Sequence, residues 1–157
     1  MAITSSFMFS KYKEMMMGRS LTAGEALALT LSASVAAALI LESHTPDRDA
    51  STTGSYRSVF ASRIANAASA TGAADVVLSS NEISSSSGIT FFDAADIAFV
   101  SVSTGQSIGG ILIYRRITND GDSFPIALID IGNPVTANGA SINVNWDNGV
   151  NRIFSLT

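Results

Sequence analysis

The sequence predicts a mainly β protein, an antiparallel β-sandwich or jelly roll with one or two short helices. The second half of the chain is the main evidence, because apolar segments there are separated by turns rich in Gly, Asn and Asp. Segment 141–146, SINVNW, alternates strictly, so Ile142, Val144 and Trp146 share one face and polar residues the other. Short strands separated by such turns are typical of antiparallel sandwiches and jelly rolls.

The chain length predicts the domain organisation. A chain of 157 residues is the right size for one compact domain. We therefore expect a single domain over residues 1–157, with an N-terminal arm or short helix over 1–20 and a β-sandwich over 31–157.

The N-terminal segment 5–17 has the spacing of an amphipathic helix. Met8, Tyr12, Met15 and Met16 fall on one apolar stripe, and the Gly that follows suits a helix end. The stripe either packs on the chain's own core or, together with Phe7, contacts a neighbouring subunit, a role for which flexible Met side chains are suited.

The remaining elements are predicted in chain order. We expect a strand over 31–43, a loop at Pro46, a helix over 55–66, a small-residue linker over 67–75, a strand over 76–80 and a Ser-rich surface loop over 81–88. Strands follow at 107–117, 123–132, 141–146 and 150–157, with a hairpin-type turn at 147–149. Gly109 and Gly110 mark a bulge or a close approach of another segment. Arg115 and Arg116 end their strand at a solvated sheet edge or against an acidic partner surface.

Composition excludes several classes of function. Charged residues make up only 14% of the chain and hydrophobic residues 46%, which is easiest to understand if another subunit covers part of the surface. A net charge of −4 leaves no basic patch for phosphates, so nucleic-acid binding is not expected. The absence of cysteine excludes disulfides and Cys-containing zinc sites. Run 21–41 follows basic residues as in a signal peptide, but it contains Glu25 and is rich in Ala, Ser and Thr, so no membrane segment is expected.

Two carboxylates, Asp93 and Asp96, interrupt the apolar stretch 89–102. The residues on both sides alternate as strands do, so DAAD is interpreted as a short break between two strands. Asp side chains shape such breaks by accepting backbone N–H bonds. A calcium site and a glycosidase-type acid/base pair are the alternatives, although neither a DxDxDG run nor a third partner supports them.

His44 and Trp146 are each the only residue of their type. We interpret His44, close to Asp47 and Asp49, as a hydrogen-bonded loop histidine, since no GxSxG elbow accompanies it. Trp146 is interpreted as a core anchor, with a platform for stacking a sugar as the alternative. The sequence predicts no catalytic, cofactor-binding or metal-binding residue.

Six segments, in their order along the chain, resemble a family of small tailed-bacteriophage virion proteins. These segments are FSKYKEMMMGR, VAAALILESHTPDRD, FFDAADIAFVSV, GGILIYRRI, ALIDIG and INVNWDNGVNRIFSL. Segment 55–88 departs from the family pattern, because an Ala/Ser-rich stretch stands where a Gly-Tyr-type strand is expected.

The resemblance implies a non-enzymatic structural protein of the virion, most simply a capsid cement protein. It would be made in the host bacterial cytoplasm, bind the major capsid protein on the outside of the shell and self-associate, as a homotrimer. Neither a membrane nor a cofactor is implied. The apolar N-terminal residues and the strand end described above supply the candidate assembly contacts, which are Phe7, Met8, Tyr12, Met15, Met16, Arg115 and Arg116. A tail, head–tail adaptor or fibre-base protein is one alternative, and a secreted hydrolase or sugar-binding module that uses Asp93, Asp96 and Trp146 is another.

Overall fold

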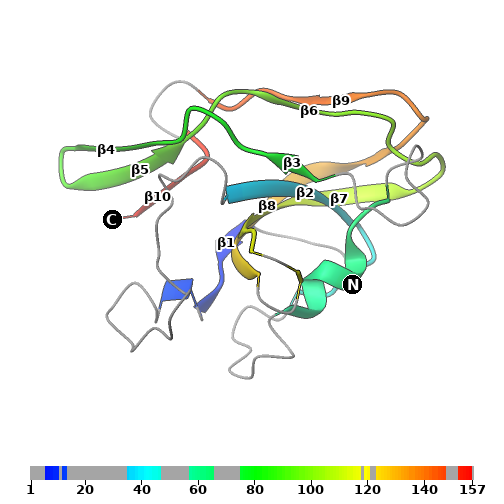
Figure 1. Ribbon diagram of the computed structural model, residues 1–157, viewed down its shortest axis with the longest axis horizontal. Coiled ribbons are helices and arrows are strands. Elements are labelled where there is room, and N and C mark those ends of the chain that lie inside the picture. The colour runs from blue at the N-terminus through cyan, green and yellow to red at the C-terminus, as the bar shows by residue number, and fades with distance from the viewer. Residues whose placement is uncertain are drawn as a thin grey trace.

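The computed structural model describes residues 6–10, 12–13, 35–46, 57–65, 75–117, 119–120, 123–147 and 152–156. This part of the chain is mainly β, and its antiparallel sheets form a β-sandwich-like fold (Figure 1). The predicted fold class is therefore confirmed. No helix among these residues has both the length and the apolar character needed to cross a membrane.

The largest sheet has five strands in the order β1–β8–β7–β2–β3. Its members are β1 (Phe7–Met8), β8 (Phe124–Thr136), β7 (Ser107–Arg115), β2 (Val35–Leu41) and β3 (Val76–Val77). All neighbouring strands in it run antiparallel. Strands β2 and β7 are buried almost throughout, as their continuous apolar sequences require.

Two smaller sheets complete the described fold. One contains β10 (Phe154–Leu156), β5 (Ile89–Asp93) and β4 (Glu82–Ser86), and the other pairs β6 (Ile97–Phe99) with β9 (Ile142–Val144). Figure 1 shows the β4–β5 hairpin extending away from the five-stranded sheet. The chain passes from one small sheet to the other between β5 and β6, at the DAAD segment.

The Ser-rich segment 81–88 is not a loop, as the sequence suggested, but strand β4 and its turn. Ser86 pairs with Ile89, so the hairpin loop consists of Ser87 and Gly88. Both have positive φ, of 52° and 79°, which is the backbone conformation of a tight two-residue hairpin turn. The prediction was wrong because Ser has low strand propensity, whereas pairing with β5 decides the structure here.

The predicted helix over 5–17 is also wrong at its start. Phe7 and Met8 form β1, paired with Leu128 and Ala127 of β8, and helical geometry begins only at Ser10. Met8 and Tyr12 therefore do not share a helical stripe, while Met15 and Met16 lie outside the described residues. Pairing with an apolar strand satisfies the backbone of this segment before a helix can begin.

The helix predicted over 55–66 is shorter and of a different type. Residues Arg57–Ser62 form a 3-10 helix, η2, and its neighbourhood buries Val59, Phe60 and Ile64. The apolar positions were identified correctly, whereas the helix type was not. Ile64 leaves the helix and donates its backbone N–H to Leu39 O at 2.9 Å, which joins this segment to β2.

One hydrophobic cluster connects the described elements. It extends from Phe9 near the N-terminus to Ile153 near the C-terminus and includes the apolar face of β2, β7 and β8. At Gly109 the sheet comes close to the turn after β2, because a Cβ on Gly109 would stand 2.6 Å from Glu42 Cα. The predicted bulge or close approach at this glycine is confirmed, since the β7–β8 register also shifts between Ile108 and Gly110.

Candidate assembly surface

Asp93 and Asp96 hold the join between β5 and β6 through backbone hydrogen bonds. Asp93 Oδ1 accepts the N–H of Ala94 at 2.9 Å, and Asp96 Oδ1 accepts the N–H of Trp146 at 2.8 Å. The second bond connects positions 50 residues apart and fixes the end of β9 against the join. These contacts are those of carboxylates that shape a strand break.

Neither the two aspartates nor the histidine belongs to a metal-type cluster. Within the described ranges, no group of three or more His, Asp or Glu side chains could hold a metal ion. His44 is buried, and its Nδ1 lies 2.9 Å from Ser62 Oγ at the end of η2. Burial lowers the pKa of His44 from its ordinary value, so the ring is neutral near pH 7. Asp47 and Asp49, its neighbours in sequence, lie outside the described residues.

Trp146 and Tyr12 point into the chain rather than away from it. Trp146 is 8% exposed and Tyr12 3% exposed, and both belong to the hydrophobic cluster. A tryptophan this deeply buried offers no open ring face on which a sugar could stack. Tyr12 likewise has no surface with which to contact a neighbouring subunit, so it is removed from the set of assembly contacts.

The two arginines at the end of β7 differ in exposure, since Arg115 is half-buried and Arg116 exposed. Arg116 lines a small cavity of about 130 Å³ together with Arg63, Asp75 and Asp120. An ion-pair cluster forms one wall of this cavity. Arg63 Nη1 lies 2.5 Å from Asp75 Oδ2, and Arg63 Nη2 lies 2.5 Å from Asp120 Oδ2.

Tyr114 completes this cluster from β7. Its hydroxyl donates to Asp75 Oδ2 at 2.7 Å, and burial together with the nearby Asp75 carboxylate raises the pKa of Tyr114. The cluster could not be predicted from the sequence, because its members come from the residue after η2, the segment before β3, strand β7 and a loop. The contacts hold these separate elements together, so we interpret the cluster as structural.

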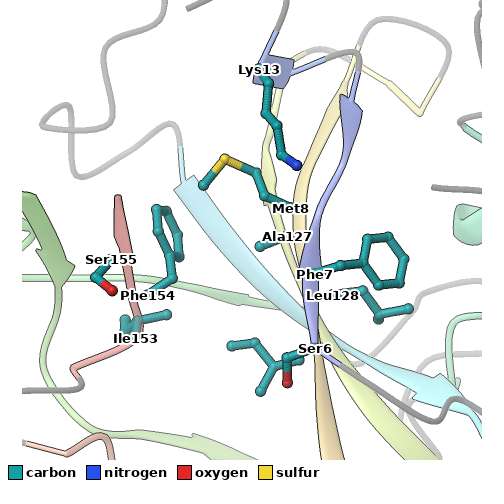
Figure 2. Close-up of a pocket in the computed structure, with 10 residues that line it drawn as sticks. Ser6, Phe7, Met8, Lys13, Ala127, Leu128, Ile153, Phe154 and Ser155 are labelled. Carbon is teal, nitrogen blue, oxygen red and sulfur yellow. The ribbon is translucent and has the colours of Figure 1, made fainter. Parts of the chain in front are cut away.

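A concave surface lies between β1 and β10, near the two ends of the described chain. It is a groove of about 490 Å³ between the outer strand of the five-stranded sheet and an outer strand of the three-stranded sheet (Figure 2). The groove is lined by Ser6, Phe7, Met8, Lys13, Ala127, Leu128, Ile129, Ile153, Phe154 and Ser155. Two of the predicted assembly contacts, Phe7 and Met8, thus lie in it.

The groove has apolar walls and one cationic group. Figure 2 shows the Met8 side chain directed toward Phe154 of β10, while Lys13 extends toward the same space from the turn after β1. Lys13 is exposed, and it is the one charged residue in the described lining of the groove. Sequence reasoning identified the β1 side through its apolar residues but missed the β10 side, because nothing local indicates that 153–155 lies opposite 7–8.

Comparisons with protein-family models, with curated proteins and with solved structures found no match to this chain. The groove, the strand edges beside it and the ordered sequence segments described above are the features of the chain that bear on its function.

Proposed function

We propose that this chain is a structural protein of a tailed-bacteriophage virion, a cement protein that binds the outside of the major capsid lattice and stabilises it. The observation that carries this proposal is the groove between β1 and β10. An apolar hollow beside two strands that are outermost among the described strands of their sheets is a surface that another polypeptide can cover.

The composition of the chain supports an assembly role. Only 14% of its residues are charged, and a protein that stays bound to other subunits needs less charged surface than a free one. Cementing also works through many copies, because weak contacts repeated over a lattice add up to a large total stabilisation. A closed trimer would match a threefold axis of such a lattice, and we propose this state for the free protein.

The ordered resemblance to virion proteins supports the same role. Five of the six segments include strand residues: VAAALILESHTPDRD contains β2, FFDAADIAFVSV the end of β5 and all of β6, GGILIYRRI most of β7, ALIDIG the middle of β8, and the last segment β9 and β10. Most of the similarity therefore falls on segments that contribute to the sheets.

The copy number of this chain in purified particles tests the proposal. Quantitative mass spectrometry of phage particles that encode this chain should find it in a fixed ratio to the major capsid protein, with at least one copy per several capsid subunits. A few copies per particle would instead indicate a tail, head–tail adaptor or fibre-base protein. Absence from washed particles would contradict a virion role altogether.

A further inference from the structure

We propose that the groove between β1 and β10 binds an extended segment of another protein that carries apolar side chains and one carboxylate group. The inference deepens the proposed function. It rests on that function only for the identity of the protein that carries the bound segment, which would then be the major capsid protein. The chemistry of the bound segment follows from the groove itself.

The volume and lining of the groove suit a short stretch of polypeptide. At about 490 Å³ it falls in the range of about 300–1,000 Å³ that is usual for binding pockets in proteins. Met8 and Ile129 on one side and Phe154 on the other are half-buried apolar side chains, whereas Leu128 and Ile153 are buried in the core. Apolar side chains of a bound segment would remove this surface from water.

The edge of β1 offers main-chain hydrogen bonds to an extended segment. Phe9 donates its N–H to Ile126 O of β8 at 3.0 Å, and Phe7 pairs with Leu128 two residues earlier. Main-chain groups alternate in direction along an antiparallel strand, so the N–H and C=O of Met8 point away from β8. Among the described strands β1 is the last in its sheet, so no other described strand pairs with these two groups.

The charge in the groove defines the polar part of the ligand. Among the described lining residues Lys13 alone is charged, and its side chain extends toward the groove (Figure 2). None of the described residues that line the groove is acidic. A carboxylate on the bound segment would pair with this ammonium group, whereas a basic segment would be repelled.

A peptide selection tests the chemistry without assuming the partner. The full chain serves as bait for a displayed library of random peptides. We expect enriched peptides to combine apolar residues with one Asp or Glu, and we expect selection on Lys13→Glu to replace that acid with Lys or Arg. Lys13→Glu should weaken the affinity for an acidic peptide by about tenfold, which is equivalent to about 1.4 kcal/mol of binding free energy. No enrichment, or an acid preference that survives Lys13→Glu, would overturn the inference.

Two matched variants locate the binding site. Ser155→Trp fills the groove from β10 and should abolish peptide binding, whereas Ser86→Trp, at an exposed Ser on β4 of the same sheet, should leave it unchanged. Unfolding curves verify that both variants fold. If Ser155→Trp does not fold, Lys13→Glu, which alters an exposed side chain, still tests the site. Equal binding by both Trp variants would contradict this location.

Thiol labelling verifies that the groove is open in the free protein. The chain has no cysteine, so Met8→Cys and the control Ser86→Cys each carry a single thiol. A maleimide should label both folded variants at comparable rates, and an acidic peptide should slow only Met8→Cys. A Met8→Cys thiol that reacts only after unfolding would show that the chain covers its own groove, which overturns the inference.

The two proposals can fail separately. Peptide binding at the groove by a chain that is absent from particles would retain the inference and remove the virion role. Particles that contain the chain and also bind the Ser155→Trp variant normally would retain the virion role and remove the inference.

Discussion

At the residue scale, Asp96 is the clearest case of a side chain whose role can be tested. It accepts the backbone N–H of Trp146 at 2.8 Å and so connects the DAAD join to the end of β9. The sequence indicated a turn-forming aspartate, since the flanking residues alternate as strands. It did not indicate the partner, because Trp146 is 50 residues away.

Replacing Asp96 with Ala should lower the free energy of unfolding by about 1–2 kcal/mol, because the backbone N–H of Trp146 loses its carboxylate acceptor. Asp96→Asn retains an acceptor oxygen and should cost less. Asp93→Ala is the matched control, since its carboxylate bonds only the next residue. Trp146 is the only tryptophan, so its fluorescence can monitor urea unfolding and give the free energy of unfolding of all three variants. Equal losses for Asp93→Ala and Asp96→Ala would contradict this assignment.

His44 predicts how stability depends on pH. Burial lowers the pKa of His44 below its ordinary value of 6.5, so the unfolded chain binds its proton more readily than the folded one. The stabilisation is complete above about pH 6.5 and is lost as the pH falls from there toward the lowered pKa of the folded state.

The variant His44→Gln should therefore flatten the pH dependence of the unfolding free energy in the range just below pH 6.5, because the chain has no other histidine. Ser62→Ala removes the hydrogen-bond partner of His44 but keeps the titrating ring, and it serves as the control. If His44→Gln and the parent show the same slope with pH, the buried neutral histidine is not responsible.

At the scale of elements, the contact between β7 and the turn after β2 depends on Gly109. A Cβ at this position would lie 2.6 Å from Glu42 Cα, a backbone atom that cannot move without shifting the strand. We expect Gly109→Ala to reduce the free energy of unfolding by about 1–3 kcal/mol.

Gly105→Ala separates crowding from backbone strain, because Gly105 has a φ of 78° but open space around it. Its cost should be about 1–2 kcal/mol and arise from the left-handed backbone alone. In the β2–β7 sheet, hydrogen exchange of amides such as that of Leu39 should accelerate in Gly109→Ala and not in Gly105→Ala. Acceleration in both would contradict a local steric effect.

The Arg63 cluster shows what the sequence could not predict among the elements. Arg63 joins Asp75, 12 positions away, and Asp120, 57 positions away, and neither spacing forms a local motif. Arg63→Ala should cost about 1–3 kcal/mol, because the half-buried Asp75 carboxylate loses its cation. Asp120→Asn is the control and should cost less than about 1 kcal/mol, because that carboxylate is 53% exposed. Thermal or urea unfolding measures both, and a larger loss for Asp120→Asn would contradict the ranking.

Strands could be predicted from sequence where periodicity and composition agreed. Val35–Leu41 and Ile142–Val144 fall within their predicted segments because a continuous apolar run and strict alternation are both strong strand signals. Glu82–Ser86 was missed, although the Ser-Gly pair at its turn is a known hairpin signal. Phe7–Met8 was assigned to a helix because two residues are too few to show a strand period.

At the scale of the whole molecule, the fold class followed from the sequence but the groove did not. The turns and alternating segments of the second half predict antiparallel sheets whatever their order in space. The groove requires the N-terminal residues Phe7–Met8 to lie near the C-terminal residues Phe154–Leu156, and only the three-dimensional sheet arrangement brings them together. The low content of charged residues predicted that another subunit covers part of the surface, without indicating which part.

Location of this chain on intact phage particles tests the central claim most directly. Antibodies raised against the chain and detected with gold particles by electron microscopy should label the whole surface of the head, as expected for a protein on the outside of the capsid lattice. Antibody that is first incubated with an excess of the purified chain should not label the particles, which controls for specificity. Label confined to one vertex or to the tail, or no label on any particle, would contradict a capsid cement role.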